Sequence, residues 1–283
     1  MPAPVKKCAV LADPRDPEKD LLIREVLDRL LELFEKAGIE TQTFVDVPVS
    51  SIDPDSGTGL FLVLGGDGTM IHFAARLSHL EIPFYGLNYG NVGFMMNNPA
   101  EGLAKHVAKI QKAEFALWEF PVLRVRSRDL KGMVHEGVGL NDIYLQRMTP
   151  QSCKVNITLG KEPLDINPLL CDGLVVATPL GSTAYNFNVT GSLVAIDAQV
   201  LTLTPVAAHR HCPVSCMMLP LDTLIRFDIL EPMKRRVQVV SDGQSHGDLT
   251  QAEISISPSR VKLCFDREHS ENLPMRFINK ACG

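Results

Sequence analysis

Residues 65–69, GGDGT, combine three glycines with a single carboxylate, and they are the first place in the sequence where chemistry is expected. The apolar run at residues 60–64 predicts a strand that enters this segment, and a helical pattern follows it. Glycines permit positive φ and close approach, so several backbone N–H groups can point at one anion, and the helix N-terminus adds partial positive charge. This pattern predicts a phosphate site at the carboxyl end of a strand.

Asp67 needs a separate explanation, because a carboxylate repels phosphate oxygens unless it has another task. It could bind a Mg²⁺ ion that bridges the phosphates, or it could accept a proton from an attacking hydroxyl. Both tasks belong to phosphoryl transfer. The alternative is a tight turn in which Asp67 caps the following helix. The segment has neither the Walker pattern nor G-x-G-x-x-G, so the common nucleotide-binding loops are excluded.

Two further segments carry polar side chains next to predicted strands. The strand expected at residues 174–177 ends in a turn whose hydroxyls, amide and aromatic ring suit the base and ribose of a nucleoside, although a capping turn is the alternative. Its polar residues are Thr178, Ser182, Thr183, Tyr185 and Asn186. Asn141 and Asp142 lie between a glycine loop and an alternating strand, and either paired ribose hydroxyls or an Asx turn explains them.

Composition excludes several classes of protein. The net charge of −5 argues against a nucleic-acid partner, which requires a basic surface. The N-terminal apolar run is too short for a signal peptide or a membrane span, so we expect a cytoplasmic protein with no membrane partner. Seven cysteines in a chain of 283 residues do not suggest a disulfide framework. Cys212 and Cys216, beside His209 and His211, leave a metal site open as the less favoured alternative to thiols of no special role.

The order of predicted elements indicates two domains. Strands are expected at residues 7–12, 40–45, 59–64 and 83–88, and helices at 21–37, 69–80 and 100–112. This alternation is typical of an α/β layered sheet. After about residue 115 short alternating segments separated by Gly, Pro and Asp predict a mostly β domain. We therefore divide the chain into an α/β domain (1–114), a mostly β, substrate-binding domain (115–265) and a tail (266–283) that could pack back on the first domain.

With these segments in order, the sequence resembles the NAD kinases of the bacterial type. The motifs that carry the resemblance are GGDGT, the ND pair at 141–142 and TPLGSTAYN at 178–186, with YGLNYGNVGFM, LTPVAAH and DGQ as further matches. They extend from about residue 60 to 245. Phosphofructokinases and diacylglycerol or sphingosine kinases carry similar glycine loops, so TPLGSTAYN is the more specific motif.

The resemblance implies transfer of the γ-phosphoryl group of ATP to the 2′-hydroxyl of the adenosine ribose of NAD, which gives NADP. Asp67 would accept the proton of that hydroxyl, Phe94 would lie against adenine, Asn141 and Asp142 would hold substrate hydroxyls, and Asp172 would reach the nicotinamide end. The residues assigned to the ATP polyphosphate are Gly65, Gly66, Gly68 and Thr69. Those assigned to NAD are Phe94, Asn141, Asp142, Asp172, Thr178, Ser182, Thr183, Ala184, Tyr185 and Asn188.

The resemblance also implies a Rossmann-like N-terminal domain, a β-sandwich-like C-terminal domain, and a homodimer or homotetramer with the dinucleotide site near a subunit interface. Mg²⁺ or another divalent cation is expected on the ATP phosphates, with no protein ligand assigned to it. The chain departs from the family at NFNVTGSLV, where Asn188, Val189 and Thr190 replace smaller residues, and at Asp142, which is one methylene shorter than the common glutamate. A nucleotide-binding regulator with weakened catalysis and a lipid kinase are the alternatives.

Overall fold

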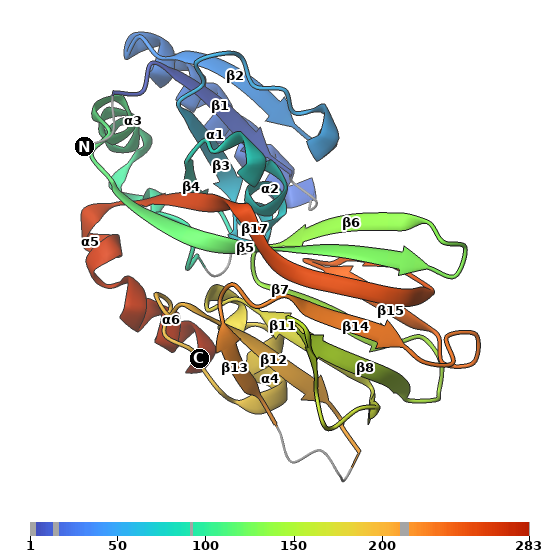
Figure 1. Cartoon of the computed structure of the whole chain (residues 1–283). Coiled ribbons are helices and arrows are strands. Elements are labelled where there is room, and N and C mark those ends of the chain that lie inside the picture. The colour runs from blue at the N-terminus through green and yellow to red at the C-terminus, as the bar shows by residue number, and fades with distance from the viewer. Residues whose placement is uncertain (1–3, 14–16, 91–92, 210–214, 283) are drawn as a thin grey trace. The chain divides into compact units, whose positions relative to one another are not determined.

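The structure, a computed structural model, describes residues 4–13, 17–90, 93–209 and 215–282. The chain divides into two compact units (Figure 1). The first, which we call the α/β unit, comprises Met1–Phe120 and Arg260–Arg276. The second, the β-rich unit, comprises Pro121–Ser259 and Phe277–Gly283. Two long strands, β5 (Ala116–Asp129) and β17 (Leu249–Phe265), each begin in one unit and end in the other.

A parallel sheet forms the centre of the α/β unit. Its strand order is β4-β3-β1-β2, and residues 263–264 at the end of β17 pair in parallel with β4. The strands are β1 (Lys7–Ala12), β2 (Glu40–Val45), β3 (Leu60–Gly65) and β4 (Phe84–Asn88). Every residue of β3 is buried, as expected for a parallel strand covered on both faces. The four strands predicted for this region are confirmed.

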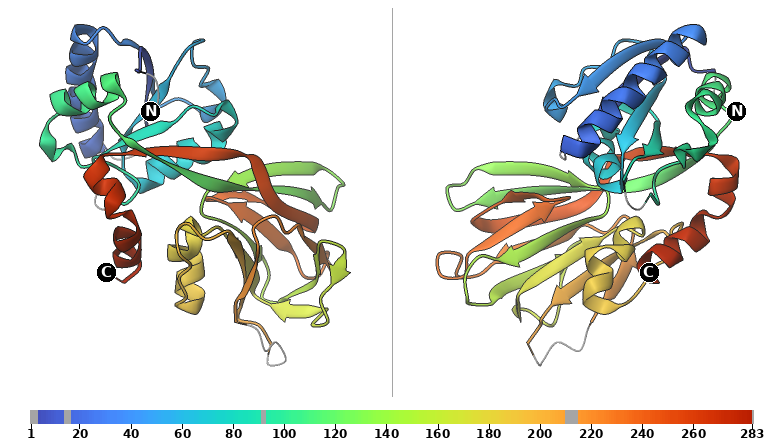
Figure 2. Two further views of the ribbon diagram at one scale, coloured as in Figure 1. Left: turned by 60° about the vertical axis from the view of Figure 1, so that its left-hand side comes forward. Right: turned by 180° about the vertical axis from the view of Figure 1, so that it is seen from behind.

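Helices cover both faces of this sheet. The buried residues of α1 (Pro17–Lys36) and α3 (Leu103–Lys112) pack on one face, where alternate residues of β1 and β3 meet them. Figure 2 shows α1 running across that face. On the other face α2 (Asp67–Leu77) brings Met70 against Gly86, where a Cβ would lie 2.8 Å from the methionine methyl. The predicted α/β layering is therefore confirmed.

Short helices complete the α/β unit. Three of them have 3₁₀ geometry: η1 (Val49–Ser51), η2 (Ser78–Leu80) and η3 (Pro99–Glu101). Near the end of the chain α5 (Arg267–Glu271) is followed by α6 (Leu273–Cys282), shown in dark red in Figure 2, whose residues from Phe277 on belong to the β-rich unit. In α5 Ser270 accepts a hydrogen bond from the indole of Trp118, at 2.7 Å. None of the helices in the described residues is long and apolar enough to span a membrane.

The β-rich unit contains two packed sheets. One is antiparallel throughout, with the order β13-β12-β11-β7-β15-β16, and in the other β14 pairs antiparallel with β8 and β17. Apolar residues from both sheets form one core cluster, in which Leu145 and Val176 of the first meet Ile157 and Phe227 of the second. The bounds are β6 (Val134–Gly139), β7 (Asp142–Arg147), β8 (Cys153–Leu159), β9 (Glu162–Pro163), β10 (Leu169–Cys171), β11 (Gly173–Ala177), β12 (Val200–Val206), β13 (Met217–Pro220), β14 (Ile225–Ile229), β15 (Val237–Ser241) and β16 (Gln244–His246).

Two local predictions in this unit are wrong. The polar turn expected after β11 is instead helical, with η4 (Leu180–Thr183) followed by α4 (Tyr185–Thr190). The glycine loop expected before Asn141 is the end of β6, since Gly137 and Gly139 pair with β5. Gly137 lies where a Cβ would be 2.7 Å from the Ser241 hydroxyl, so its glycine serves close packing in a sheet.

Candidate active site

The carboxylate of Asp67 is bound by two backbone amides. Asp67 is the first residue of α2, directly after Gly66 at the N-cap. One carboxylate oxygen, Oδ2, accepts from Phe94 N at 3.1 Å, and Oδ1 accepts from Met95 N at 2.8 Å. The side chain is half-buried. Hydrogen bonds to an ionised acceptor are stronger than neutral ones, so the carboxylate is fixed in direction and can act as a proton acceptor or cation ligand.

The three glycines around Asp67 differ in what they contribute. Gly65 has φ +155°, and a Cβ there would lie 2.6 Å from the Thr69 hydroxyl. Gly66 is extended, and a Cβ on it would lie 3.4 Å from the Cα of Gly90. Gly68 is exposed, and no atom of the described residues lies within 4 Å of a Cβ built there. Positive φ is therefore confirmed at Gly65 alone, and the fold itself gives no reason for a glycine at position 68.

Phe94 takes part in the site through its backbone, and contact of its ring with adenine stays a prediction. Its side chain is 3% exposed, and its backbone N–H binds Asp67. Its carbonyl accepts from Nε2 of His269, at 3.2 Å, and the neighbouring Gly93 carbonyl accepts from the Arg276 guanidinium, at 2.8 Å. Sequence analysis assigned no role to His269 or Arg276. No local pattern could have found them, because they lie more than 170 residues from the carbonyls they bind.

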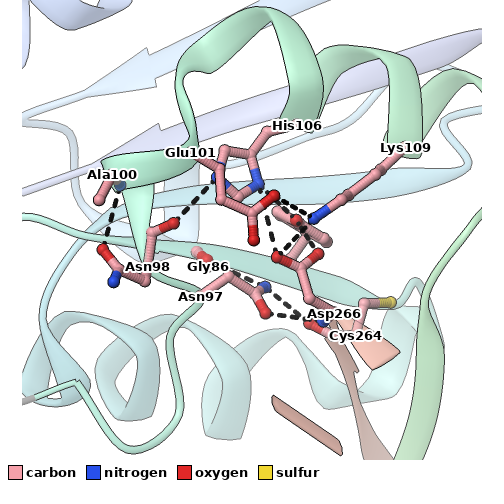
Figure 3. Close-up of polar contacts among 10 residues, drawn as sticks. Gly86, Asn97, Asn98, Ala100, Glu101, His106, Lys109, Cys264 and Asp266 are labelled. Carbon is pink, nitrogen blue, oxygen red and sulfur yellow. Dashed lines mark hydrogen bonds and ion pairs between the residues drawn. The ribbon is translucent and has the colours of Figure 1, made fainter. Parts of the chain in front are cut away.

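A buried polar network around Asn97 fixes the end of the loop that follows β4 and carries Gly93, Phe94 and Met95. The Asn97 side chain donates to the carbonyls of Gly86 and Cys264, at 3.2 and 3.0 Å, and accepts from Asp266 N at 2.9 Å. Figure 3 shows these bonds beneath α3. They connect the loop to β4 and to the end of β17 at the same point. The loop is therefore held by the sheet and by residues 266–276, which we call the C-terminal segment.

The carboxylate of Asp266 extends the network to α3. It accepts from the Tyr85 hydroxyl at 2.7 Å and pairs with Lys109 at 3.0 Å. Lys109 also pairs with Glu101 at 2.8 Å (Figure 3). His106 lies on the same helix and donates from Nε2 to the Asn98 carbonyl at 3.0 Å. Charged groups buried in this way are paired and hydrogen-bonded, which makes the start of the C-terminal segment rigid.

Acid should destabilise the protein through His269. Burial, together with the positive charge of Arg276, lowers the pKa of His269 from its usual value near 6.5 to about 4, although Phe94 O and Asp266 favour protonation. The unfolded chain then binds a proton at a higher pH than the folded chain does, so the stabilisation is full above pH 6.5 and is lost toward pH 4. At about 1.4 kcal/mol per pH unit, the expected loss is roughly 3 kcal/mol.

Urea unfolding at several pH values between 4 and 7.5 measures this effect. H269Q is the control, because its amide can still donate to the Phe94 carbonyl but does not titrate. The difference in unfolding free energy between wild type and H269Q should change across that window. A difference that is constant with pH would contradict the assignment.

In the β-rich unit a second polar group surrounds Asn141. The Asp242 carboxylate accepts from the backbone of Leu140 and Asn141, at 2.6 and 3.4 Å. Thr178 binds the same turn, with its hydroxyl donating to the Leu140 carbonyl at 2.7 Å. The amide oxygen of Asn141 is buried and has no hydrogen-bond partner among the residues that the structure describes. Buried polar atoms are nearly always paired, so this oxygen is a candidate acceptor for a ligand hydroxyl.

Asp142 lies next to this acceptor and is 7% exposed. Burial, together with the nearby Asp242 carboxylate, raises the pKa of Asp142 to about 7, although the backbone amide of Tyr185 opposes the shift. At neutral pH the carboxyl group can therefore either donate to a hydroxyl or accept from one. That versatility suits a site for paired ribose hydroxyls.

The segment after β11 divides into buried and accessible residues. Thr178 and Ser182 are fully buried, and their hydroxyls bond to backbone groups of other segments: Thr178 donates to the Leu140 carbonyl at 2.7 Å, and Ser182 accepts from Val194 N at 3.1 Å. These two side chains shape the turn, and their contact with NAD stays a prediction. The residues left accessible are Thr183, Ala184 and Tyr185, which are half-buried, and Asn188, which is exposed. Tyr185 packs edge-on against Tyr144, with ring centroids 5.0 Å apart.

Asp172, predicted at the nicotinamide end, is engaged by Arg147. The two side chains form a bidentate pair at 2.8 and 3.1 Å, and both are about one-third exposed. Among the described residues no group of three or more His, Cys, Asp or Glu side chains could hold a metal ion. His211 and Cys212, from the alternative metal site, lie outside the described residues.

Comparison with known proteins identifies the family. The ATP-NAD kinase N-terminal domain matches residues 46–115, and the ATP-NAD kinase C-terminal domain matches residues 140–265. NAD kinase of Cereibacter sphaeroides is 37% identical over 211 residues, covering 74% of this chain and 80% of its own. NAD kinase of Hyphomonas neptunium is 33% identical over 213 residues, covering 75% and 81%.

Two solved structures share the fold. Yeast NADH kinase complexed with NADH has a TM-score of 0.80 at 20% identity, covering 99% of this chain and 88% of its own. An NAD kinase from Archaeoglobus fulgidus in complex with ATP has a TM-score of 0.72 at 22% identity, covering 96% and 98%. The two domain matches and the curated relatives together show that this chain belongs to the ATP-NAD kinase family.

Proposed function

We propose that this protein is an NAD kinase, which transfers the γ-phosphoryl group of ATP to the 2′-hydroxyl of the adenosine ribose of NAD and releases NADP. The observation that carries the proposal is the Asp67 carboxylate, directed by two backbone amides at the N-terminus of α2. Family membership supplies the reaction, and this geometry supplies the group that can accept the proton of the attacking hydroxyl.

Positioning and charge neutralisation should contribute more to the rate than the base does. The transition state of phosphoryl transfer is loose, so the attacking hydroxyl keeps most of its proton while the bond to the leaving group breaks. In our assignment Gly65, Gly66, Gly68 and Thr69 bind the polyphosphate through backbone amides and a hydroxyl at the start of α2. A divalent cation such as Mg²⁺ bound to ATP would neutralise phosphate charge, and the Asp67 carboxylate is an oxygen ligand of the kind that Mg²⁺ accepts.

The β-rich unit supplies the contacts that we assign to NAD. The Asn141 oxygen, which has no partner among the described residues, and the adjacent Asp142 carboxyl support binding of ribose hydroxyls. Thr183, Ala184 and Tyr185 come from a later segment whose Tyr185 backbone amide binds Asp142. Asp172 would reach the nicotinamide end with Arg147 as its partner. In the α/β unit the Phe94 ring would lie against adenine. The other residues assigned to NAD are Thr178, Ser182 and Asn188.

The cellular setting follows from the same assignment. We place the protein in the cytoplasm, as a homodimer or homotetramer with the dinucleotide site near a subunit interface.

The α/β unit would be the Rossmann-like domain of the family and the β-rich unit its β-sandwich-like domain. The 2-1-3-4 order of the parallel strands and the two packed sheets with a common core support these assignments.

The direct test is to incubate the purified protein with ATP, Mg²⁺ and NAD and to follow NADP with an NADP-specific dehydrogenase. Turnover that requires all three components supports the proposal. Tight NAD binding without turnover would instead indicate a nucleotide-binding regulator, the alternative suggested by the NFNVTGS segment. Phosphorylation of a lipid alcohol in place of NAD would indicate a lipid kinase.

Gly68 offers a prediction that separates folding from ATP binding. An alanine Cβ has open space at this helical position, so G68A should leave stability unchanged or raise it by up to about 1 kcal/mol. The same methyl group would obstruct phosphates approaching the first turn of α2. We expect KM for ATP to rise about tenfold, equivalent to about 1.4 kcal/mol. KM for NAD serves as the internal control, and an unchanged KM for ATP would argue against this phosphate site.

A further inference from the structure

The two peptide groups that bind Asp67 are also bound at their other ends. The N–H of Phe94 and the carbonyl of Gly93 belong to one planar peptide group, and the N–H of Met95 and the carbonyl of Phe94 belong to the next. The N–H ends donate to Oδ2 and Oδ1 of Asp67, at 3.1 and 2.8 Å. The carbonyl ends accept from Arg276 and His269, at 2.8 and 3.2 Å. Each oxygen of the carboxylate is thus connected to one side chain of the C-terminal segment through a single rigid amide.

Arg276 lies in α6 and is half-buried, so its guanidinium is partly removed from water. Burial lowers the pKa of Arg276, and the charge of Asp67 acts in the opposite direction. The guanidinium therefore attracts the same carboxylate to which it is connected through the Gly93–Phe94 peptide. A hydrogen bond from a charged donor to a carbonyl also polarises the peptide group and strengthens the bond made by its N–H.

His269 connects the second peptide group. The carbonyl of Phe94 can only accept, so Nε2 of His269 carries the proton that is donated to it. The ring is 7% exposed and stacks on Phe265, with centroids 4.9 Å apart. The neighbouring Ser270 is held by Trp118, and Asp266 by Tyr85 and Lys109. His269 is therefore presented from a rigid segment and has little freedom to follow the loop if the loop moves.

We propose that Arg276 and His269 are positioning residues of the phosphoryl-transfer reaction, which set the direction of the Asp67 carboxylate through the Gly93–Phe94 and Phe94–Met95 peptide groups. The inference rests on the proposed NAD kinase function. It gives α5 and α6 a part in the turnover step. Neither residue has to touch a substrate, because both act through the Asp67 carboxylate. Truncating either side chain releases one peptide group at its carbonyl end and lets one carboxylate oxygen drift.

The test compares variants that remove the donor with variants that keep one. R276M and H269L remove it, whereas R276K and H269Q retain a side-chain N–H that can reach the carbonyl. A displacement of 1 Å at a reacting group can reduce a rate about a hundredfold, so loss of one of two supports should lower kcat about tenfold. KM for ATP and for NAD should stay within about threefold, and R276K and H269Q should recover most of the lost rate. R267Q, an exposed arginine of α5, is the matched control and should behave as wild type.

A double-mutant cycle separates positioning from general damage to the fold. Since the two residues act through the Asp67 carboxylate, R276M in a D67N background should lower kcat by less than about twofold beyond D67N alone. A further tenfold loss in that background, or wild-type kcat in both R276M and H269L, would overturn the proposal. Should R276M unfold, R276L is assayed in its place, since leucine also removes the donor. Absence of NADP formation by the wild-type protein would reject the proposed function itself, which is a different result.

Discussion

Asp67→Asn is expected to lower kcat at least about a hundredfold, because general-base catalysis contributes about 10²–10⁴-fold. Asparagine has nearly the same shape but no negative charge, and it cannot take the proton of the ribose hydroxyl. The N–H groups of Phe94 and Met95 each bind a different carboxylate oxygen, and the NH2 group that replaces one of these oxygens in asparagine cannot accept. The substitution therefore removes the base and also weakens the bonds that direct it.

Binding of NAD should survive this substitution, because most contacts assigned to the dinucleotide belong to the β-rich unit. Calorimetric titration with NAD should give a Kd within about threefold of wild type, which corresponds to well under 1 kcal/mol. D28N, at an exposed position of α1, controls for loss of one surface charge. A kcat for D67N within tenfold of wild type would remove both the base and the metal-binding roles from Asp67.

The second large effect is expected at Gly181, in η4 of the segment that follows β11. A Cβ at this position would overlap the backbone carbonyl oxygen of Asn141, and its next contacts are also with Asn141 backbone atoms. Backbone cannot move aside as the end of a flexible side chain can. Thr178 binds the same turn with two groups. Its backbone N–H donates to the Asn141 carbonyl at 2.9 Å, and its hydroxyl donates to the Leu140 carbonyl. Gly181→Ala should therefore separate the turn at 140–141 from η4.

We expect G181A to lower the unfolding free energy by about 3 kcal/mol, at the upper end of what overpacking costs. Urea denaturation measures the loss, and NAD affinity should fall with it, since both segments are assigned to the dinucleotide. G191A is the matched control in the same region. Gly191 has φ +67° but open space at its Cβ, so only backbone strain of about 1 kcal/mol is expected there. Equal losses in the two variants would show that the Asn141 contact is unimportant.

The sequence by itself determined the elements whose signals are local. β1, β3 and β4 form where apolar runs predict them, and α1 follows its apolar stripe to a left-handed glycine at Gly38. These signals are reliable because burial on both faces of a parallel strand requires a continuous apolar run. The GGDGT, ND and TPLGSTAYN motifs likewise identified the family, which the two domain matches confirm.

Sequence patterns were misleading where tertiary contacts override local preference. Residues 185–190 contain asparagine and β-branched residues, which disfavour a helix interior, yet they form α4 because Asn186 is buried and bonded to Thr204 at 2.7 Å. Gly137 and Gly139 were interpreted as a loop, but pairing with β5 places them in a strand. In both places the deciding partner lies outside the local pattern.

Tertiary structure alone decided how Asp67 is held. The sequence placed the carboxylate in a glycine loop at the start of a helix, but its hydrogen-bond donors are 27 and 28 residues away, and the side chains behind those donors lie still farther along the chain. The donors are the backbone N–H groups of Phe94 and Met95, and a backbone group leaves no mark on the residue type at its position. A sequence can therefore show that a carboxylate is available, whereas the direction in which it points depends on the loop and the C-terminal segment that the fold brings together.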